Sequence, residues 1–277
     1  MPVTATAVKA LRERTGLPMM ECKKALGETD GDENAAVEWL RARGQQVAEK
    51  RADRETAFGR FGIYCGVDND SGAMVEFKCE SAPVTQNEEF IQLANDLAEA
   101  LAKNADVEGD CEKLMALDCP SNPGTSLGAI KDDLFNRIRE VFNVGRMVRI
   151  EGATAGYSHN SSTVAGVLLG VEGGSDEVGR DIAMHVAAMN PSALSVDELD
   201  ADVVTAEKNV LREAAIAEGK PENIVDKMVE GRMKNFYAER VLLEQTFVKA
   251  ENKETVGEFA KSNGMLVKQF SHMVLGE

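Results

Sequence analysis

The pattern that most constrains the fold of this chain occurs twice: two short apolar runs joined by a turn and followed by an amphipathic helix. In the first copy, FGRFGIYCGV and GAMVEFKC flank the turn DNDSG at residues 68–72, which predicts a β-hairpin. The helix after it carries Phe90, Leu93, Leu97 and Leu101, spaced by three to four residues.

The second copy leads from MVRIEG through AGYSHNSSTV to VAGVLLGVEG. Its helix has an apolar face and is expected to stop at Asn190-Pro191. We therefore predict two related hairpin-plus-helix subdomains, at about residues 58–103 and 145–190, within an α+β chain.

Three short helices are predicted for residues 4–44. Thr6 is expected to cap the first helix and Thr15-Gly16 to end it. Pro18 is expected to begin the second helix, and Gly44 to close the third. The Ala, Glu, Lys and Arg content of residues 45–54 then indicates a helical linker.

The remaining segments are predominantly helical. Residues 104–144 are first acidic and then helical from Leu127 to Val141. Residues 202–238 have a thin apolar face and charged flanks, which predicts a protruding antiparallel helical hairpin resembling a coiled coil. The sequence ends with a short helix in TVGEFAKSNG and a last apolar segment, MLVKQFSHMVL. We expect three domains, at 1–54, 55–142 and 143–277.

The charge balance argues against general nucleic-acid binding. The 277 residues include 31 basic and 47 acidic side chains, a net charge of −16, whereas phosphate binding needs Lys and Arg to displace counterions. The same argument disfavours anionic membranes. One local basic cluster exists, Lys50 to Arg54, preceded by Arg41 and Arg43. A solvated helix end or linker is the favoured interpretation of this cluster, with an RNA contact as the alternative.

The five cysteines form no C-x-x-C pair, and no apolar run approaches the roughly 20 residues of a membrane span. No charged-then-apolar leader opens the sequence. We therefore expect a reduced cytoplasmic protein with free thiols and without a membrane partner.

Sequence motifs of catalysis and cofactor binding are missing. There is no Walker loop, G-x-G-x-x-G, H-E-x-x-H or G-x-S-x-G motif. Asp68 and Asp70 suit a hairpin turn better than a calcium loop, because the expected twelfth-position acid is missing. We expect neither an enzyme nor a bound metal or cofactor.

The three histidines have different settings. His185 is expected to pack on the face of its helix, and His272 has no obvious partner. His159 falls in GYSHNSS, at the turn of the second hairpin, and is interpreted as a surface contact residue. A thiol pair of Cys79 with His159 is the weaker alternative.

Several blocks of the sequence closely resemble the bacterial translation elongation factor Ts family. They are VKALRERTGLPMMECKKAL at residues 8–26, GDENAAVEWLRARG, IAMHVAAMNP and GKPENIVDKMVEGRMKNF, and they occur in the family's order over essentially the whole chain. The resemblance implies a nucleotide exchange factor that binds the GTPase elongation factor Tu and loosens GDP and its magnesium ion. It also implies that the N-terminal module has a ubiquitin-associated-like fold and docks near the nucleotide domain of the GTPase.

The resemblance also explains MVEFKCESAPVTQNEEF, residues 74–90, in which a strand runs through a small polar tip into a helix. Residues 78–84 match a family signature, Asn-Cys-Gln-Thr-Asp-Phe-Val, whose Asp and Phe enter the GTPase. Here the tip consists of Ser81, Ala82, Pro83 and Val84, so Ala-Pro replaces the carboxylate and the ring. Three interpretations stay open: an altered pocket in the partner, exchange carried by other contacts, or a chaperone of the GTPase with weak exchange.

Other contacts of the family can be carried over by position. Met19 and Met20 match its paired methionines, of which we expect only one to be exposed. Ile138 matches an apolar contact, although Arg139 replaces the glycine that follows, and His159 matches the family's hairpin histidine. Two competing functions stay open: a binding module without exchange activity on residues 1–44, and a thiol enzyme using Cys79.

Overall fold

The computed structural model describes residues 3–51, 53–161, 163–219 and 221–277. It divides into two compact units. Unit 1 comprises Met1–Ile63, Ala73–Arg149 and Leu275–Glu277, and unit 2 comprises Tyr64–Gly72 and Ile150–Val274. The mixed α+β composition predicted from the sequence is confirmed, with N-terminal helices followed by sheets and helices.

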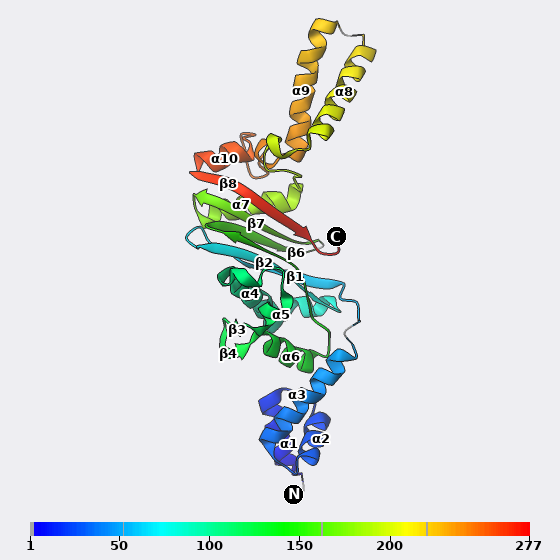
Figure 1. The fold of residues 1–277 in the computed structure, drawn as a ribbon, viewed down its shortest axis with the longest axis vertical. Helices are drawn as coiled ribbons and strands as arrows, with labels where there is room; N and C mark the ends of the chain where they lie inside the picture. Colours follow the sequence, from blue (N-terminus) through cyan, green and yellow to red (C-terminus); the bar gives the residue numbers. More distant parts are fainter. Residues whose placement is uncertain (1–2, 52, 162, 220) are drawn as a thin grey trace. The chain divides into compact units, whose positions relative to one another are not determined.

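Unit 1 begins with three helices, α1 (Ala5–Thr15), α2 (Met19–Glu28) and α3 (Glu33–Glu49) (Figure 1). They enclose a small apolar core of eight buried side chains: Val8, Leu11, Leu17, Cys22, Ala25, Leu26, Ala36 and Leu40. Gly16 ends α1 in the left-handed conformation at φ +70°, as predicted. The N-cap prediction was wrong, because Thr4 rather than Thr6 accepts the hydrogen bond from the Ala7 amide.

The third helix does not close at Gly44, contrary to the prediction, and runs on to Glu49. Gly44 instead marks a close approach of two helices. A Cβ at this position would lie 1.9 Å from Oδ1 of Asn136 in α6 (Leu127–Ile138), so a larger residue would have to displace the Asn136 side chain. The predicted helical linker of residues 45–54 is therefore partly α3, and Ala52 lies outside the described residues.

A three-stranded sheet follows in the order β1-β2-β5, from β1 (Phe58–Tyr64), β2 (Ser71–Cys79) and β5 (Asn143–Glu151). The first predicted hairpin and helix are confirmed as β1, β2 and α4 (Glu88–Lys103). Helix α4 packs closely on the strands, because Phe90 stacks on Phe77 with ring centroids 4.5 Å apart. The segment between α4 and β5 contains α5 (Cys111–Ala116), β3 (Asp118–Cys119), β4 (Asn122–Ser126) and α6, which ends at Ile138 rather than Val141.

Unit 2 contains an antiparallel sheet in the order β6-β7-β8, from β6 (Thr154–Asn160), β7 (Val164–Gly173) and β8 (Met265–Val274). The final apolar segment of the sequence is thus an edge strand. The second predicted hairpin is β6 and β7, and the prediction that MVRIEG belongs to it was wrong, because most of that segment lies in β5 of the first sheet. Helix α7 (Asp176–Met189) packs on β6, and α10 (Val256–Ser262) lies beside β8. Asn190 ends α7 at φ 45°, which confirms the predicted stop.

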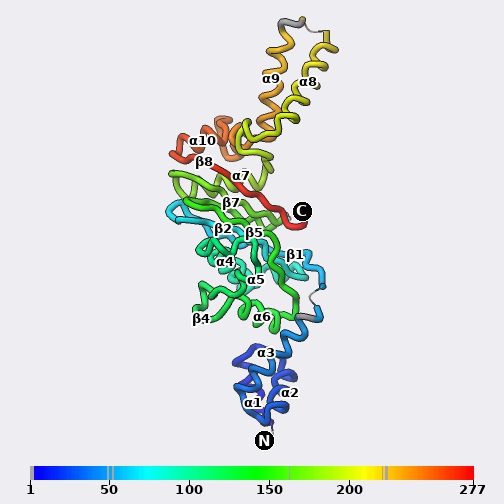
Figure 2. Tube along the Cα trace, viewed as in Figure 1, coloured from blue at the N-terminus to red at the C-terminus, as the bar shows by residue number. Residues whose placement is uncertain are grey.

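The predicted helical hairpin is confirmed as α8 (Ala201–Ala217) and α9 (Glu222–Arg240), which run side by side in Figures 1 and 2. The buried centre of its apolar seam is formed by Ala215, Val225, Val229, Met233 and Phe236, and partly buried apolar side chains pack against it. Ion pairs of Arg212 with Asp226 and of Arg232 with Glu218 connect the two helices at the flanks. Within the described part of the chain, no helix has the length and apolar character needed to cross a membrane.

Candidate partner-binding site

The tip of residues 81–84 is an ordered turn of 3-10 helix rather than an open loop. The helix spans Ala82–Gln86, and Pro83 lies in its first turn. Oγ1 of Thr85 donates to the carbonyl of Ala82 at 2.7 Å, which fixes the start of the turn. Ala82 and Pro83 are exposed, whereas Val84 is buried. The tip therefore presents one methyl group and one pyrrolidine ring on a backbone that is held by the buried Val84 side chain and by the hydrogen bond from Thr85.

Two glutamates connect the tip to the segment after α6. The carboxylate of Glu140 accepts the backbone N–H of Ser81 at 3.0 Å and also its hydroxyl. The carboxylate of Glu80 accepts the backbone N–H of Val141 at 2.8 Å. Each segment thus supplies the acceptor for an amide of the other. Charged acceptors make stronger hydrogen bonds than neutral ones, so these reciprocal hydrogen bonds hold the tip firmly.

The basic cluster of residues 50–54 takes part in the same arrangement. Nη1 of Arg54 lies 3.0 Å from Glu80, and Nη1 of Arg51 donates to the carbonyl of Arg139 at 2.9 Å. Arg139 caps α6 in the left-handed conformation at φ 68°, so Arg51 satisfies a carbonyl at the helix end. Burial would raise the pKa of Glu80, but the hydrogen bonds from Val141 and Arg54 and the positive charges of Arg54 and Arg51 lower it. Two arginines of the cluster thus have intramolecular partners.

The thiol at the base of the tip is not set up as a nucleophile. Cys79 is buried, and its Sγ–H donates to the carbonyl of Ser81 at 3.3 Å. Burial and the negative charge of Glu140 raise the pKa of Cys79 to about 12. The thiolate, which is the reactive form of cysteine, is therefore scarce at neutral pH, and this argues against thiol chemistry at this position.

Both paired methionines lie on the surface at the start of α2. Met19 is 52% exposed and Met20 is 73% exposed, so the expectation that only one would be exposed was wrong. Exposed methionines are flexible apolar contact residues. Ile138 is half-buried at the last position of α6.

His159 lies within strand β6, paired with Ala165 of β7, rather than in the turn where the sequence suggested it. It is half-buried. Its Nδ1 lies 3.0 Å from the hydroxyl of Tyr157, and its Nε2 lies 3.0 Å from Oγ of Ser161. The ring is therefore held in place beside the end of the hairpin.

The other two histidines are structural. His185 is fully buried on α7, as predicted. His272 has a partner that the sequence did not suggest, because its Nδ1 lies 2.9 Å from Oδ1 of Asn190.

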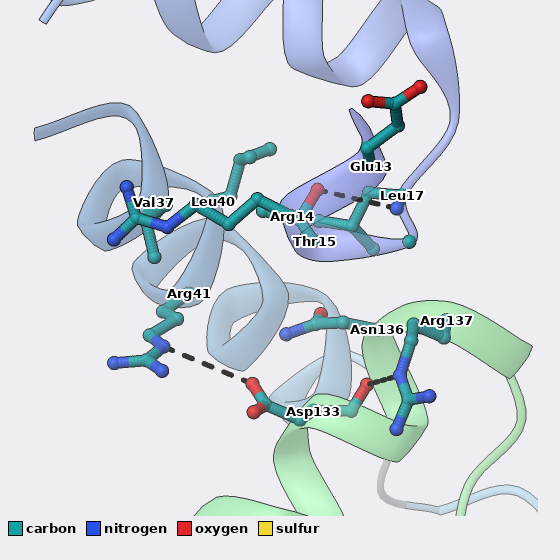
Figure 3. A pocket seen from close by; sticks show the side chains of 11 residues that line it. Glu13, Arg14, Thr15, Leu17, Val37, Leu40, Arg41, Asp133, Asn136 and Arg137 are labelled. Carbon is teal, nitrogen blue, oxygen red and sulfur yellow. Dashed lines mark hydrogen bonds and ion pairs between the residues drawn. The ribbon is translucent and has the colours of Figure 1, made fainter. Parts of the chain in front are cut away.

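A cavity of about 430 Å³ lies in unit 1 between the N-terminal helices and α6 (Figure 3). Arg41 faces Asp133 across it at 3.9 Å, and Nε of Arg137 donates to the carbonyl of Asp133 at 3.4 Å (Figure 3). Arg137 also forms an ion pair with Glu89. Asp133 thus interacts with one arginine of α3 and with one of its own helix. Across the described residues, no group of three or more His, Cys, Asp or Glu side chains is arranged to hold a metal ion.

Sequence reasoning missed the residues that fix the tip. Glu80 lies within the recognised signature, so its place beside the tip could have been anticipated. Glu140 and Arg54 are 59 and 26 residues away from their partners, and no local pattern indicates such pairs.

The comparisons with known proteins agree with one another. The sequence model of the family described as "Elongation factor TS" matches residues 50–277. The chain is 41% identical to elongation factor Ts of Hyphomonas neptunium over 99% of this chain and 92% of the relative. It is 42% identical to that of Alkalilimnicola ehrlichii, over 100% and 93%, and 38% identical to that of Aquifex aeolicus, over 100% and 99%. The chain therefore belongs to the elongation factor Ts family, the nucleotide exchange factors of elongation factor Tu in translation elongation.

Proposed function

We propose that this chain promotes release of GDP and its magnesium ion from elongation factor Tu by pressing the tip of Ser81, Ala82, Pro83 and Val84 against the GTPase. The observation that carries the proposal is the geometry of the tip: Ala82 and Pro83 are exposed, while Val84 is buried and Ser81 is anchored by Glu140. The physical basis is linkage. A partner that binds the nucleotide-free form best must weaken nucleotide binding by the same factor.

The proposed tip acts through stiffness rather than size. A phenylalanine wedge can bury over about 100 Å², worth roughly 2–3 kcal/mol, and Ala82-Pro83 cannot match this area. Proline fixes the backbone, so the tip loses less conformational entropy when it docks. The hydrogen bond from Thr85 to the Ala82 carbonyl adds to this pre-organisation.

Further contacts with the GTPase are proposed at Met19 and Met20, at Ile138 and at His159. The high exposure of the two methionines, 52% and 73%, supports their part of the proposal. For the helical hairpin of α8 and α9, we propose that it contacts the partner further from the nucleotide. Val203 and Val210, one heptad apart on α8, are 45% and 59% exposed and suit such a contact.

The proposal includes a division into a ubiquitin-associated-like module with linker, residues 1–54, and two related core subdomains, residues 55–142 and 143–277. It also places the protein in the cytoplasm, bound in turn to GDP-loaded and nucleotide-free elongation factor Tu. Contacts with membranes or nucleic acids are not part of it. The net charge of −16 and the intramolecular partners of Arg51 and Arg54 support this restriction.

A second candidate function is binding of elongation factor Tu without acceleration of exchange, as a chaperone of the GTPase. The observation that favours it is the loss of the carboxylate and the ring at Ala82 and Pro83. In this case the methionines and the helical hairpin supply affinity, and the tip does not disturb the nucleotide site.

Stopped-flow release of a fluorescent GDP from elongation factor Tu of the same organism distinguishes the two functions. Exchange activity predicts a large acceleration that saturates with this protein. Tight binding in a parallel titration, without acceleration of GDP release, would establish the chaperone function instead. The variant Val203→Asp/Val210→Asp serves as a control for affinity, because it alters the helical hairpin and leaves the tip intact.

A further inference from the structure

The tip and the segment after α6 are cross-connected by reciprocal hydrogen bonds. Glu140 accepts from the backbone N–H and the hydroxyl of Ser81, and Glu80 accepts from the backbone N–H of Val141. Ser81 directly precedes the 3-10 turn that carries Ala82 and Pro83. The orientation of this residue therefore determines where the exposed tip points.

The connections differ in strength. Ser81 and Glu140 are half-buried, and one carboxylate receives two donors from one residue, a two-point contact that fixes orientation. The pair of Arg54 and Glu80 is more exposed, with 49% of the Arg54 side chain accessible, and exposed ion pairs contribute little. Glu140 is thus the residue on which the direction of the tip depends most.

The end of α6 is itself fixed, so that Glu140 has a rigid base. The amide of Arg139 bonds the carbonyl of Phe135 at 2.7 Å, and Arg51 bonds the carbonyl of Arg139 at 2.9 Å. The next residue is Glu140. A rigid base matters because a displacement of about 1 Å can reduce a rate by up to about a hundredfold when activity depends on exact placement.

We infer that Glu140 is a positioning residue for nucleotide exchange, which acts through Ser81 to fix the direction in which Ala82 and Pro83 meet elongation factor Tu. This inference rests on the proposed function of the tip. Glu140 does not touch the GTPase in this scheme. Its contribution depends wholly on the tip, and this dependence makes the inference testable.

The test measures the saturating rate of fluorescent GDP release and the half-saturating concentration for full-length variants. Glu140→Ala is expected to lower the saturating rate about tenfold and to change the half-saturating concentration much less, because placement rather than affinity is lost. Glu140→Gln is expected to restore most of the rate. Its amide oxygen can accept from the Ser81 N–H, and its amide nitrogen can donate to the Ser81 hydroxyl.

A double-mutant cycle separates positioning from a general structural role. In a protein whose tip is already blunted by Ala82→Gly/Pro83→Gly, Glu140→Ala is expected to have no further effect on the release rate. The matched control is Glu76→Gln, which alters a buried carboxylate outside the tip that also accepts a backbone amide, that of Arg146. It is expected to leave the release rate unchanged.

The inference is overturned if folded Glu140→Ala promotes GDP release at the wild-type rate. It is also overturned if Glu140→Ala lowers the release rate by the same factor in the protein with the blunted tip. Should Glu140→Ala fail to fold, as judged by circular dichroism, Ser81→Ala carries the same test. It removes the hydroxyl donor alone, and an unchanged rate would again overturn the inference. If the wild-type protein itself does not accelerate GDP release, both the proposed function and the inference are wrong. If the wild-type protein accelerates release and the variants do not change the rate as expected, only the inference is wrong.

Discussion

Nε2 of His185 lies 2.9 Å from Oε1 of Gln245 inside unit 2, and both residues are fully buried. The other ring nitrogen, Nδ1, accepts the backbone N–H of Val248 at 3.2 Å. A ring that accepts at Nδ1 and donates at Nε2 is neutral. Burial lowers the pKa of His185, although its hydrogen bond to Gln245 acts in the opposite direction.

This arrangement predicts that acidification destabilises unit 2. Because the folded pKa is lowered, the unfolded chain binds more protons between that pKa and the ordinary value of about 6.5. The stabilisation is therefore fully present above about pH 6.5 and is lost as the pH falls towards the folded pKa. Urea unfolding from pH 8 to pH 5 should show the decline, and His185→Gln should flatten it. Equal slopes in the wild-type and His185→Gln proteins would contradict the prediction.

Two glycines should respond in opposite directions to replacement by alanine. A Cβ on Gly62 of β1 would lie 1.8 Å from the carbonyl oxygen of Ala94 in α4, so the backbone of the helix would have to move. Gly231, within α9, has no atom within 4 Å of such a Cβ. We expect Gly62→Ala to destabilise unit 1 by about 2 kcal/mol or more, and Gly231→Ala to stabilise the helical hairpin by up to about 1 kcal/mol. Thermal unfolding followed by circular dichroism checks both signs.

The ion pair of Glu76 and Arg146 predicts an asymmetry between its two partners. The Glu76 side chain is 5% exposed and that of Arg146 is 38% exposed, with Oε1 and Nη2 2.8 Å apart. Removing the arginine side chain leaves the buried carboxylate with the backbone N–H of residue 146 but without its charged donor, whereas the Arg146 side chain is exposed enough to be hydrated when the glutamate is replaced. We therefore expect Arg146→Met to cost about 3 kcal/mol and Glu76→Gln about 1 kcal/mol in the free energy of unfolding. The reverse order in urea titrations at pH 7 would refute this account.

The sequence predicted those parts of the fold that depend on local signals. Gly16, Pro18 and Asn190 ended or began helices as expected, because left-handed φ values and the missing proline N–H act within one turn. Gly44 misled the prediction because its role is tertiary: it makes room for Asn136, which lies 92 positions further along the chain.

The resemblance to the family indicated where the candidate tip lies, but no sequence pattern indicated which side chains hold it in place. The resemblance indicated residues 81–84, and the structure adds that they begin a 3-10 helix. No periodic pattern links Ser81 to Glu140, since the pair forms only after the chain has passed through α4 and α6. The sequence placed His159 in a turn because glycine and serine lie near it. In the structure the strand pairing of β6 with β7 continues through His159, so the turn comes later.

The stiffness of the tip gives the last prediction, which concerns Pro83→Gly. Glycine at this position keeps the size of the tip small but frees its backbone, at a cost of about 0.4–1 kcal/mol in pre-organisation. If docking of the tip drives exchange, this loss should slow saturating GDP release about two- to fivefold, since 1.4 kcal/mol corresponds to a factor of ten. Pro123→Gly is the matched control, because Pro123 is an exposed proline of β4 in the same unit and lies outside the tip. Stopped-flow measurement of both variants decides the question. A slower rate for Pro83→Gly alone would mean that Ala82-Pro83 is a working substitute for the usual wedge, whereas unchanged rates would mean that exchange is carried by the other contacts.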